Sequence, residues 1–313
     1  MWGFVAQRLL GAALTMLLAT TLVFGALLLV PGDPAQTILG LEASPEALRA
    51  LRHALGLDRP PVQRYVEWVG RVARGDLGTS IRYGRPVREL IGARLSLTLP
   101  LVLLSMALAA GLGTLLGSVA ARSEGRRLDL TVSGFALTGL ILPSFWVGLM
   151  LILVFSARLH ALPSGGFPGW QHPGRAAVHL ILPIATLALA RAALMTRIVR
   201  GSLLEVLHED YTRTARAKGL AERAVIIRHA LRNAAIPIVT VLGLEFAQLL
   251  TAGVVVEAVF ALPGLGTLVL TGIEARDYPL VQGVVLVLAG MIVGLNLLTD
   301  LLYGMLDPRV TYG

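Results

Sequence analysis

Few residues of this chain of 313 have the types and spacings that catalysis requires. It contains no cysteine, which excludes disulfides and cysteine-based metal or redox sites. The histidines are scattered and lack the spacing of zinc ligands. No G-x-x-x-x-G-K-[ST] motif occurs, so the chain has no nucleotide-binding P-loop of its own. We therefore expect no catalytic set and no metal site, and we keep a membrane enzyme only as an alternative.

The residues that stand out are charged side chains inside long apolar stretches. Arg191 and Glu245 interrupt two such stretches, and Asp300 lies near the end of a third. Ionisable side chains within a membrane are costly, and each is a functional candidate by default. Glu245 has two interpretations. It lines a polar path and attracts an amine or a metal cation, or it pairs with Arg191 on a neighbouring helix, which we favour.

The composition explains why these charges matter. Hydrophobic residues make up 55% of the chain and charged residues 15%, with a mean hydropathy of +0.74, whereas a soluble domain has roughly a quarter charged residues. About 20 helical residues cross a hydrocarbon core, and a helix satisfies its own backbone hydrogen bonds there. The sequence predicts an all-α membrane protein with about six transmembrane helices, over residues 9–30, 95–121, 130–157, 176–196, 234–256 and 279–302.

Arginine and lysine predict how these helices are oriented. The segments 122–127 and 197–232 are rich in basic residues, and the loops after the third and fifth helices contain far fewer. The positive-inside rule places the basic loops in the cytoplasm, so both termini lie inside and residues 31–94 lie outside. We interpret the net charge of +8 as basic membrane loops and expect no nucleic-acid partner.

The outer segment, residues 31–94, is predicted to be partly helical. Ser44 is a typical N-cap before Pro45, and the helix 46–54 ends at Gly56. A second helix is predicted over 61–74, with Tyr65 and Trp68 one turn apart and suited to the membrane surface. The segment is either a small packed cap or a docking site for a partner, and the sequence leaves both open.

The basic segment 205–233 predicts a compact helix-turn-helix elbow. A helix over 210–218 ends at Gly219, which allows a left-handed backbone, and a second helix follows over 222–233. The first helix has four residues near one face, namely Tyr211, Thr214, Ala215 and Lys218. Such an elbow fits a groove on a partner protein. The alternative is a basic loop on anionic lipid.

Several motifs resemble the ABC-importer permeases of the dipeptide, oligopeptide and nickel family. Residues 211–220 read YTRTARAKGL and residues 228–233 read RHALRN, similar to that family's signature loop. Arg213 stands where importers in general have Glu, and Ala221 stands where this branch often has Ser, so a side-chain cap is missing. Further matches cover nearly the whole chain: PGDPA at 31–35, GDLGTS at 75–80, RPV at 85–87, PSFW at 143–146, EAVF at 257–260, LPGLG at 262–266, RDYP at 276–279 and DPRV at 307–310.

The resemblance implies a type I ABC-importer permease fold and a single transmembrane permease domain, residues 1–313, with the elbow as its coupling loop. It implies that a coupling helix docks on an ATP-binding subunit through Asp210, Tyr211, Thr214, Ala215, Ala217, Lys218, Gly219 and Leu220. Arg191 and Glu245 become tentative residues of the translocation path.

The same resemblance implies partners and a place in the cell. We expect a second homologous permease, two ATP-binding subunits that bind ATP and Mg²⁺, an extracytoplasmic binding protein and membrane lipid, in a bacterial or archaeal cytoplasmic membrane. This chain is expected to be the first permease of the pair, without a cofactor or enzymatic activity of its own. Peptides are the expected cargo. A nickel or metal chelate is the alternative, and an ion-gradient-driven secondary transporter is a third hypothesis.

Overall fold

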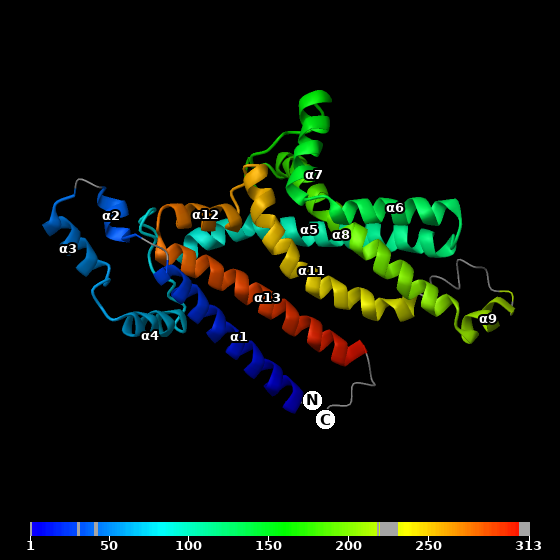
Figure 1. Ribbon diagram of the computed structural model, residues 1–313, viewed down its shortest axis with the longest axis horizontal. Helices are drawn as coiled ribbons and strands as arrows, with labels where there is room; N and C mark the ends of the chain where they lie inside the picture. Colours follow the sequence, from blue (N-terminus) through cyan, green and yellow to red (C-terminus); the bar gives the residue numbers. More distant parts are fainter. Residues whose placement is uncertain (1, 30–31, 41–42, 218, 220–230, 307–313) are drawn as a thin grey trace. The chain divides into compact units, whose positions relative to one another are not determined.

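A computed structural model of the chain describes residues 2–29, 32–40, 43–217, 219 and 231–306 (Figure 1). These residues form helices and connecting loops, with one isolated antiparallel bridge between Thr79 and Pro86 and no strand within the described ranges. In the described part of the chain, five helices are long and apolar enough to cross a membrane, and a bent helix pair brings the number to as many as six spans. The predicted all-α membrane class with about six spans is therefore confirmed.

The chain divides into two compact units. The first consists of residues 1–97 and 264–297, and the second consists of residues 98–263 with 298–311. The first unit contains α1 (Trp2–Leu29), α2 (Pro34–Leu39), α3 (Pro45–Ala54), α4 (Pro61–Val72), the start of α5 (Val87–Arg122), α12 (Leu265–Glu274) and most of α13 (Tyr278–Leu306). The second contains the rest of α5, α6 (Arg127–Ile141), α7 (Ser144–Leu151), the π-helix η1 (Ile152–Arg158), α8 (Pro173–Leu207), α9 (Asp210–Ala217) and α11 (Leu231–Val259).

The core of the first unit lies where α5, α12 and α13 meet. Its buried residues are Val87, Leu90, Ile91, Leu265, Leu268, Val269, Leu280, Val281 and Val284. Gly283 allows this close packing, because a Cβ there would lie 2.6 Å from the Cγ1 atom of Val87. Neither α2 nor α12 was predicted. The first has only six residues, and the second lies in a segment that we assigned to the loop after the fifth span.

The helix predicted after Ser44 is confirmed as α3. The Ser44 hydroxyl accepts a hydrogen bond from the Ala47 amide at 3.2 Å, and Gly56 has a φ of +67°. The predicted second helix is α4, which ends at Val72, two residues before the predicted end. Trp68 does not face the membrane surface as predicted. It is buried against Phe24 of α1, because α4 packs its aromatic side on that helix.

The third predicted span, residues 130–157, is not one continuous helix. It consists of α6 followed by α7 and η1, and the two parts are bent by 106° (Figure 1). Leu142 is extended with ψ of 127°, followed by Pro143 with ψ of 137°. Proline lacks an amide hydrogen and disfavours the helical conformation of the residue before it. The helix therefore ends before Pro143 and restarts at Ser144.

Helix α8 is central to the second unit and packs against α6, α7 and α11. Glycines of α5 let that helix approach α8 closely. A Cβ on Gly113 would lie 2.2 Å from the Met195 Cβ, and one on Gly117 would lie 2.7 Å from the Val199 Cβ. The contact therefore depends on small residues, as membrane helix pairs commonly do.

Candidate coupling elbow and its supports

The elbow starts where α8 ends, and α9 follows after two residues. The predicted helix over 210–218 is confirmed through Ala217, and Gly219 has the predicted left-handed backbone with φ of +80°. Lys218, Leu220 and most of the predicted second helix, 222–233, lie outside the described residues. From Leu231 onward the chain is helical as α11, the fifth span.

The exposed face of α9 includes three of the predicted coupling residues. Asp210, Thr214 and Ala217 are exposed, and their spacing of four and three places them on one side of the helix. The hydroxyl of Thr214 donates to the Asp210 carbonyl at 2.9 Å, so it is satisfied within α9. Tyr211 and Ala215 belong to the same helix, and their side chains lie outside the description.

Thr212 fixes the direction in which α9 leaves α8. This side chain is fully buried, and its hydroxyl lies 2.6 Å from the Glu209 carbonyl and 3.0 Å from the Leu207 carbonyl. The last carbonyls of a helix have no partner within it, so a hydroxyl here stabilises the end of α8. Sequence reasoning missed Thr212, and the only available signal was a hydroxyl residue on the face opposite Thr214.

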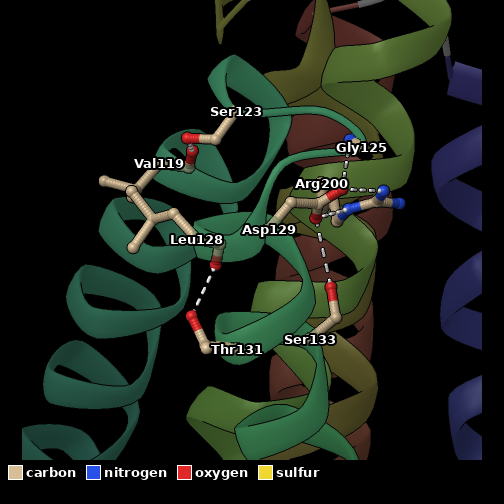
Figure 2. Close-up of polar contacts among 8 residues, drawn as sticks. All are labelled: Val119, Ser123, Gly125, Leu128, Asp129, Thr131, Ser133 and Arg200. Carbon is tan, nitrogen blue, oxygen red and sulfur yellow. Dashed lines mark hydrogen bonds and ion pairs between the residues drawn. The ribbon is translucent and has the colours of Figure 1, made fainter.

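The end of α8 is joined to the α5–α6 turn by a buried ion pair (Figure 2). Arg200 of α8 donates from Nε and Nη2 to the two carboxylate oxygens of Asp129, at 2.6 and 2.7 Å. The Gly125 amide and the Ser133 hydroxyl also donate to this carboxylate, at 3.0 and 3.3 Å. Paired Arg–carboxylate bonds of this type are short, strong and orientation-specific. The turn and the start of α6 are therefore fixed to α8.

Neither member of this pair was a predicted site residue. Asp129 precedes the predicted third span by one position, and Arg200 was counted only among the basic loop residues. The signal available was an acidic residue two positions after Arg127, at the start of an apolar stretch. A second contact joins the same elements, because His208 Nε2 lies 3.4 Å from Glu124 Oε2.

The apolar side of α8 is packed over the same length. Met195, Val199, Leu203 and Leu207 recur every four residues, and they form one buried cluster with Ala121 of α5 and Ile238 of α11. This spacing gives one continuous stripe along the helix. The segment that leads into the elbow therefore contacts α5, α6 and α11 by packing or by ion pairs.

The pairing favoured for Glu245 is present in the second unit. Arg191 Nη1 donates to Glu245 Oε2 at 2.9 Å, which joins α8 to α11. Glu245 is buried, and Arg191 is partly exposed. Asp300 has no described side chain. The proposed place of Arg191 and Glu245 on a translocation path stays a prediction.

Comparison with known protein families shows to which family this chain belongs. Residues 113–312 match the family described as the inner membrane component of binding-protein-dependent transport systems. Residues 1–102 match the N-terminal region of membrane components of such systems. The chain belongs to this family of permeases.

Relatives of the permease are similar over their full length. It is 41% identical over 312 residues to the glutathione transport system permease protein GsiC of Escherichia coli (strain K12), with 100% of both chains covered. It is 42% identical over 312 residues, again with 100% of both chains covered, to the GsiC protein of Salmonella typhi. The predicted family, an ABC-importer permease of the peptide and nickel type, and its fold are confirmed. The permease is thus a multi-pass inner membrane protein that works with other subunits of an importer.

The structure also shows what the RDYP motif of the permease does. Asp277 is buried, and its carboxylate accepts hydrogen bonds from the Ser80 hydroxyl at 2.5 Å, the Arg82 amide at 3.0 Å and the Leu280 amide at 3.2 Å. The last contact caps the first turn of α13. The others hold the loop after residue 78 against that helix. Asp277 therefore has a structural role within the first unit.

Proposed function

We propose that this permease carries short peptides across the membrane by alternating access, driven by ATP hydrolysis in partner subunits. The relatives with matching length are named for transport of glutathione, which is a tripeptide. This supports a small peptide as the cargo over the nickel chelate. The permease itself contributes neither a nucleotide site nor a catalytic group to this proposal, because ATP and Mg²⁺ belong to the ATP-binding subunits.

The proposed coupling surface is the exposed face of α9. Asp210, Thr214 and Ala217 face outward there, while Thr212 holds the helix against the end of α8. A short helix fixed at its base is suited to a groove on another protein. The residues 211, 215 and 218–220 complete the proposed surface. The alternative interpretation is a basic loop that lies on anionic lipid, and such a loop would not need the buried contact of Thr212. This contact is therefore the observation that favours coupling to a partner protein.

Movement of α9 would be passed to the membrane helices through α8. The Asp129–Arg200 pair joins α8 to α6, and the stripe from Met195 to Leu207 joins it to α5 and α11. A set of helices connected in this way moves as a rigid body, which is how many transporters change access. Arg191 and Glu245, paired between α8 and α11, would move with it.

The orientation and partners follow from the same proposal. Residues 205–233 and both termini would lie in the cytoplasm, and residues 31–94 would lie outside, where the binding protein delivers its cargo. The complete importer would contain a second, related permease and two ATP-binding subunits. The chain would form one permease domain over residues 1–313.

Ala217→Glu tests the coupling surface. The added carboxylate lies on the exposed face of α9, so the substitution leaves the packed elements intact while it obstructs a docked partner. We expect glutathione uptake by the reconstituted importer, and co-purification of the ATP-binding subunit, to fall at least tenfold. The control is Arg126→Glu, a larger change of charge at an exposed residue before α6, which should retain most uptake. Full uptake by the Ala217→Glu importer would refute the coupling role of this face.

A further inference from the structure

The first unit contains a cavity that the transport cycle described above does not use. It has a volume of about 370 Å³ and is lined by the end of α3, the connection to α4, α4 itself, the first residues of α13, Phe24 of α1 and Ile81. Arg59, Arg64 and Arg71 line it together with one acidic residue, Glu67. All of these residues belong to the same compact unit.

The charges of this cavity are only partly compensated. Arg59 pairs with Glu67 at 2.7 Å. Arg64 lies over the ring of Phe24, with its guanidinium carbon 5.9 Å from the ring centre, and neither Arg64 nor Arg71 pairs with a carboxylate among the described residues. Three arginines and one glutamate give the lining a net charge of +2. The cavity therefore favours an anion.

Trp68 adds an aromatic ring to the same wall. Its side chain is 4% exposed, and the indole Nε1 atom is buried without a hydrogen-bond partner in the part of the chain that is described. Because this atom is not accessible, Trp68 contributes the apolar surface of its ring to the cavity wall. Trp68 packs on Phe24 at 6.3 Å between ring centres, which holds the indole at the cavity wall.

The position of the cavity along the membrane-spanning helices indicates which anion can bind there. Phe24 lies within the membrane span Ala6–Leu29, five residues before its end, which is about 7.5 Å along a helix. Tyr278, Pro279 and Gln282 come from the first turns of the span Tyr278–Thr299. Tryptophan and tyrosine are enriched where the hydrocarbon meets the head groups, and arginine binds phosphate through short, charge-assisted hydrogen bonds.

We propose that this cavity binds the phosphate of an anionic membrane phospholipid, with Arg64 and Arg71 as its counter-ions. The apolar part of the lining, formed by Phe24, Leu57 and Pro279, contacts the glycerol and upper acyl region. The neighbouring cavity of about 310 Å³ is lined by Asp33, Asp58, Arg52 and Arg64, so its charges balance, whereas the first cavity has an excess of positive charge. The lipid would fasten the outer segment to the ends of α1 and α13. The inference depends neither on the cargo nor on the coupling surface.

Native mass spectrometry of the purified importer tests this proposal. The full complex in mild detergent is titrated with phosphatidylglycerol, phosphatidylcholine or inorganic phosphate, and the retained species are weighed. We expect phosphatidylglycerol to be retained in preference to phosphatidylcholine. Arg64→Gln and Arg71→Gln should each weaken retention about fivefold, since one basic residue contributes about 1 kcal/mol toward an anionic surface.

The matched control is Arg49→Gln, because Arg49 is an exposed arginine of α3 that does not line the cavity. It should retain phosphatidylglycerol like the unchanged importer. Equal weakening by Arg49→Gln would show attraction by surface charge alone and overturn the site. Displacement of the lipid by millimolar inorganic phosphate would assign the cavity to a soluble anion and overturn the lipid source. Equal retention of phosphatidylcholine would overturn the requirement for an anionic head group.

Discussion

The ion pair between Asp129 and Arg200 gives an asymmetric prediction for the two single substitutions. The Asp129 side chain is 3% exposed and the Arg200 side chain is 29% exposed. Arg200→Met leaves a carboxylate buried without its counter-ion, which costs about 3 kcal/mol at the lower end of the range for broken buried pairs. Asp129→Leu leaves an arginine whose flexible side chain still reaches solvent, so we expect the free energy of unfolding to fall by only about 1–2 kcal/mol.

The double substitution Asp129→Leu/Arg200→Met decides whether the two residues act together. Replacing a buried ion pair by apolar side chains is often nearly neutral, so the double variant should be more stable than Arg200→Met alone. The assay is equilibrium unfolding of the purified chain in mixed detergent micelles, followed by circular dichroism. Arg197→Met, at an exposed arginine of the same helix, is the control and should change stability by less than about 0.5 kcal/mol.

If the double variant lost as much stability as the two single variants together, the reasoning would be refuted. The stability changes of independent sites are additive, whereas those of coupled sites are not. The functional consequence is separate and can be measured on the same proteins. If the pair makes α6 and α8 move together, the double variant should be stable and still transport more slowly than the unchanged importer. Normal transport by the stable double variant would restrict the pair to a structural role.

Two further predictions concern single side chains. Thr212→Val removes a hydroxyl that is hydrogen-bonded to the end of α8, so we expect the free energy of unfolding to fall by about 1 kcal/mol and cargo to stimulate ATP hydrolysis less. Thr212→Ser keeps the hydroxyl and should restore both properties. Equal defects in the Val and Ser variants would contradict this role. Gly117→Ala places a Cβ 2.7 Å from the Val199 Cβ, so thermal unfolding should show a loss of about 1–3 kcal/mol. A Cβ added at Gly111 would have no atom within 4 Å, so Gly111→Ala should be neutral or slightly stabilising. A loss of stability in Gly111→Ala similar to that in Gly117→Ala would refute the packing argument.

The elements that the sequence predicted well are those defined by local chemistry. Long apolar stretches give membrane helices because a helix satisfies its own backbone. Ser44 and Gly56 delimit α3, and Gly219 allows the left-handed turn after α9, because each acts on its immediate neighbours. The elbow, as far as it is described, was predicted for this reason.

Features that depend on distant residues were not predicted. Asp129 and Arg200 are 71 positions apart, and nothing in the basic loops distinguishes a paired arginine from a solvated one. Proline is equally ambiguous, because Pro183 lies inside α8 without ending it whereas α6 ends just before Pro143. Packing by the surrounding helices decides between these outcomes, and a single sequence does not contain that information in readable form.

The contact of Asp277 with Ser80 has a consequence for how the protein is made. The two residues are 197 positions apart, and the first unit combines residues 1–97 with residues 264–297. A ribosome has therefore synthesised most of the chain before Asp277, the partner of the loop after residue 78, exists. The second unit, made largely of the intervening residues, can assemble earlier. Chains truncated before residue 277 would leave the loop after residue 78 without the carboxylate that holds it.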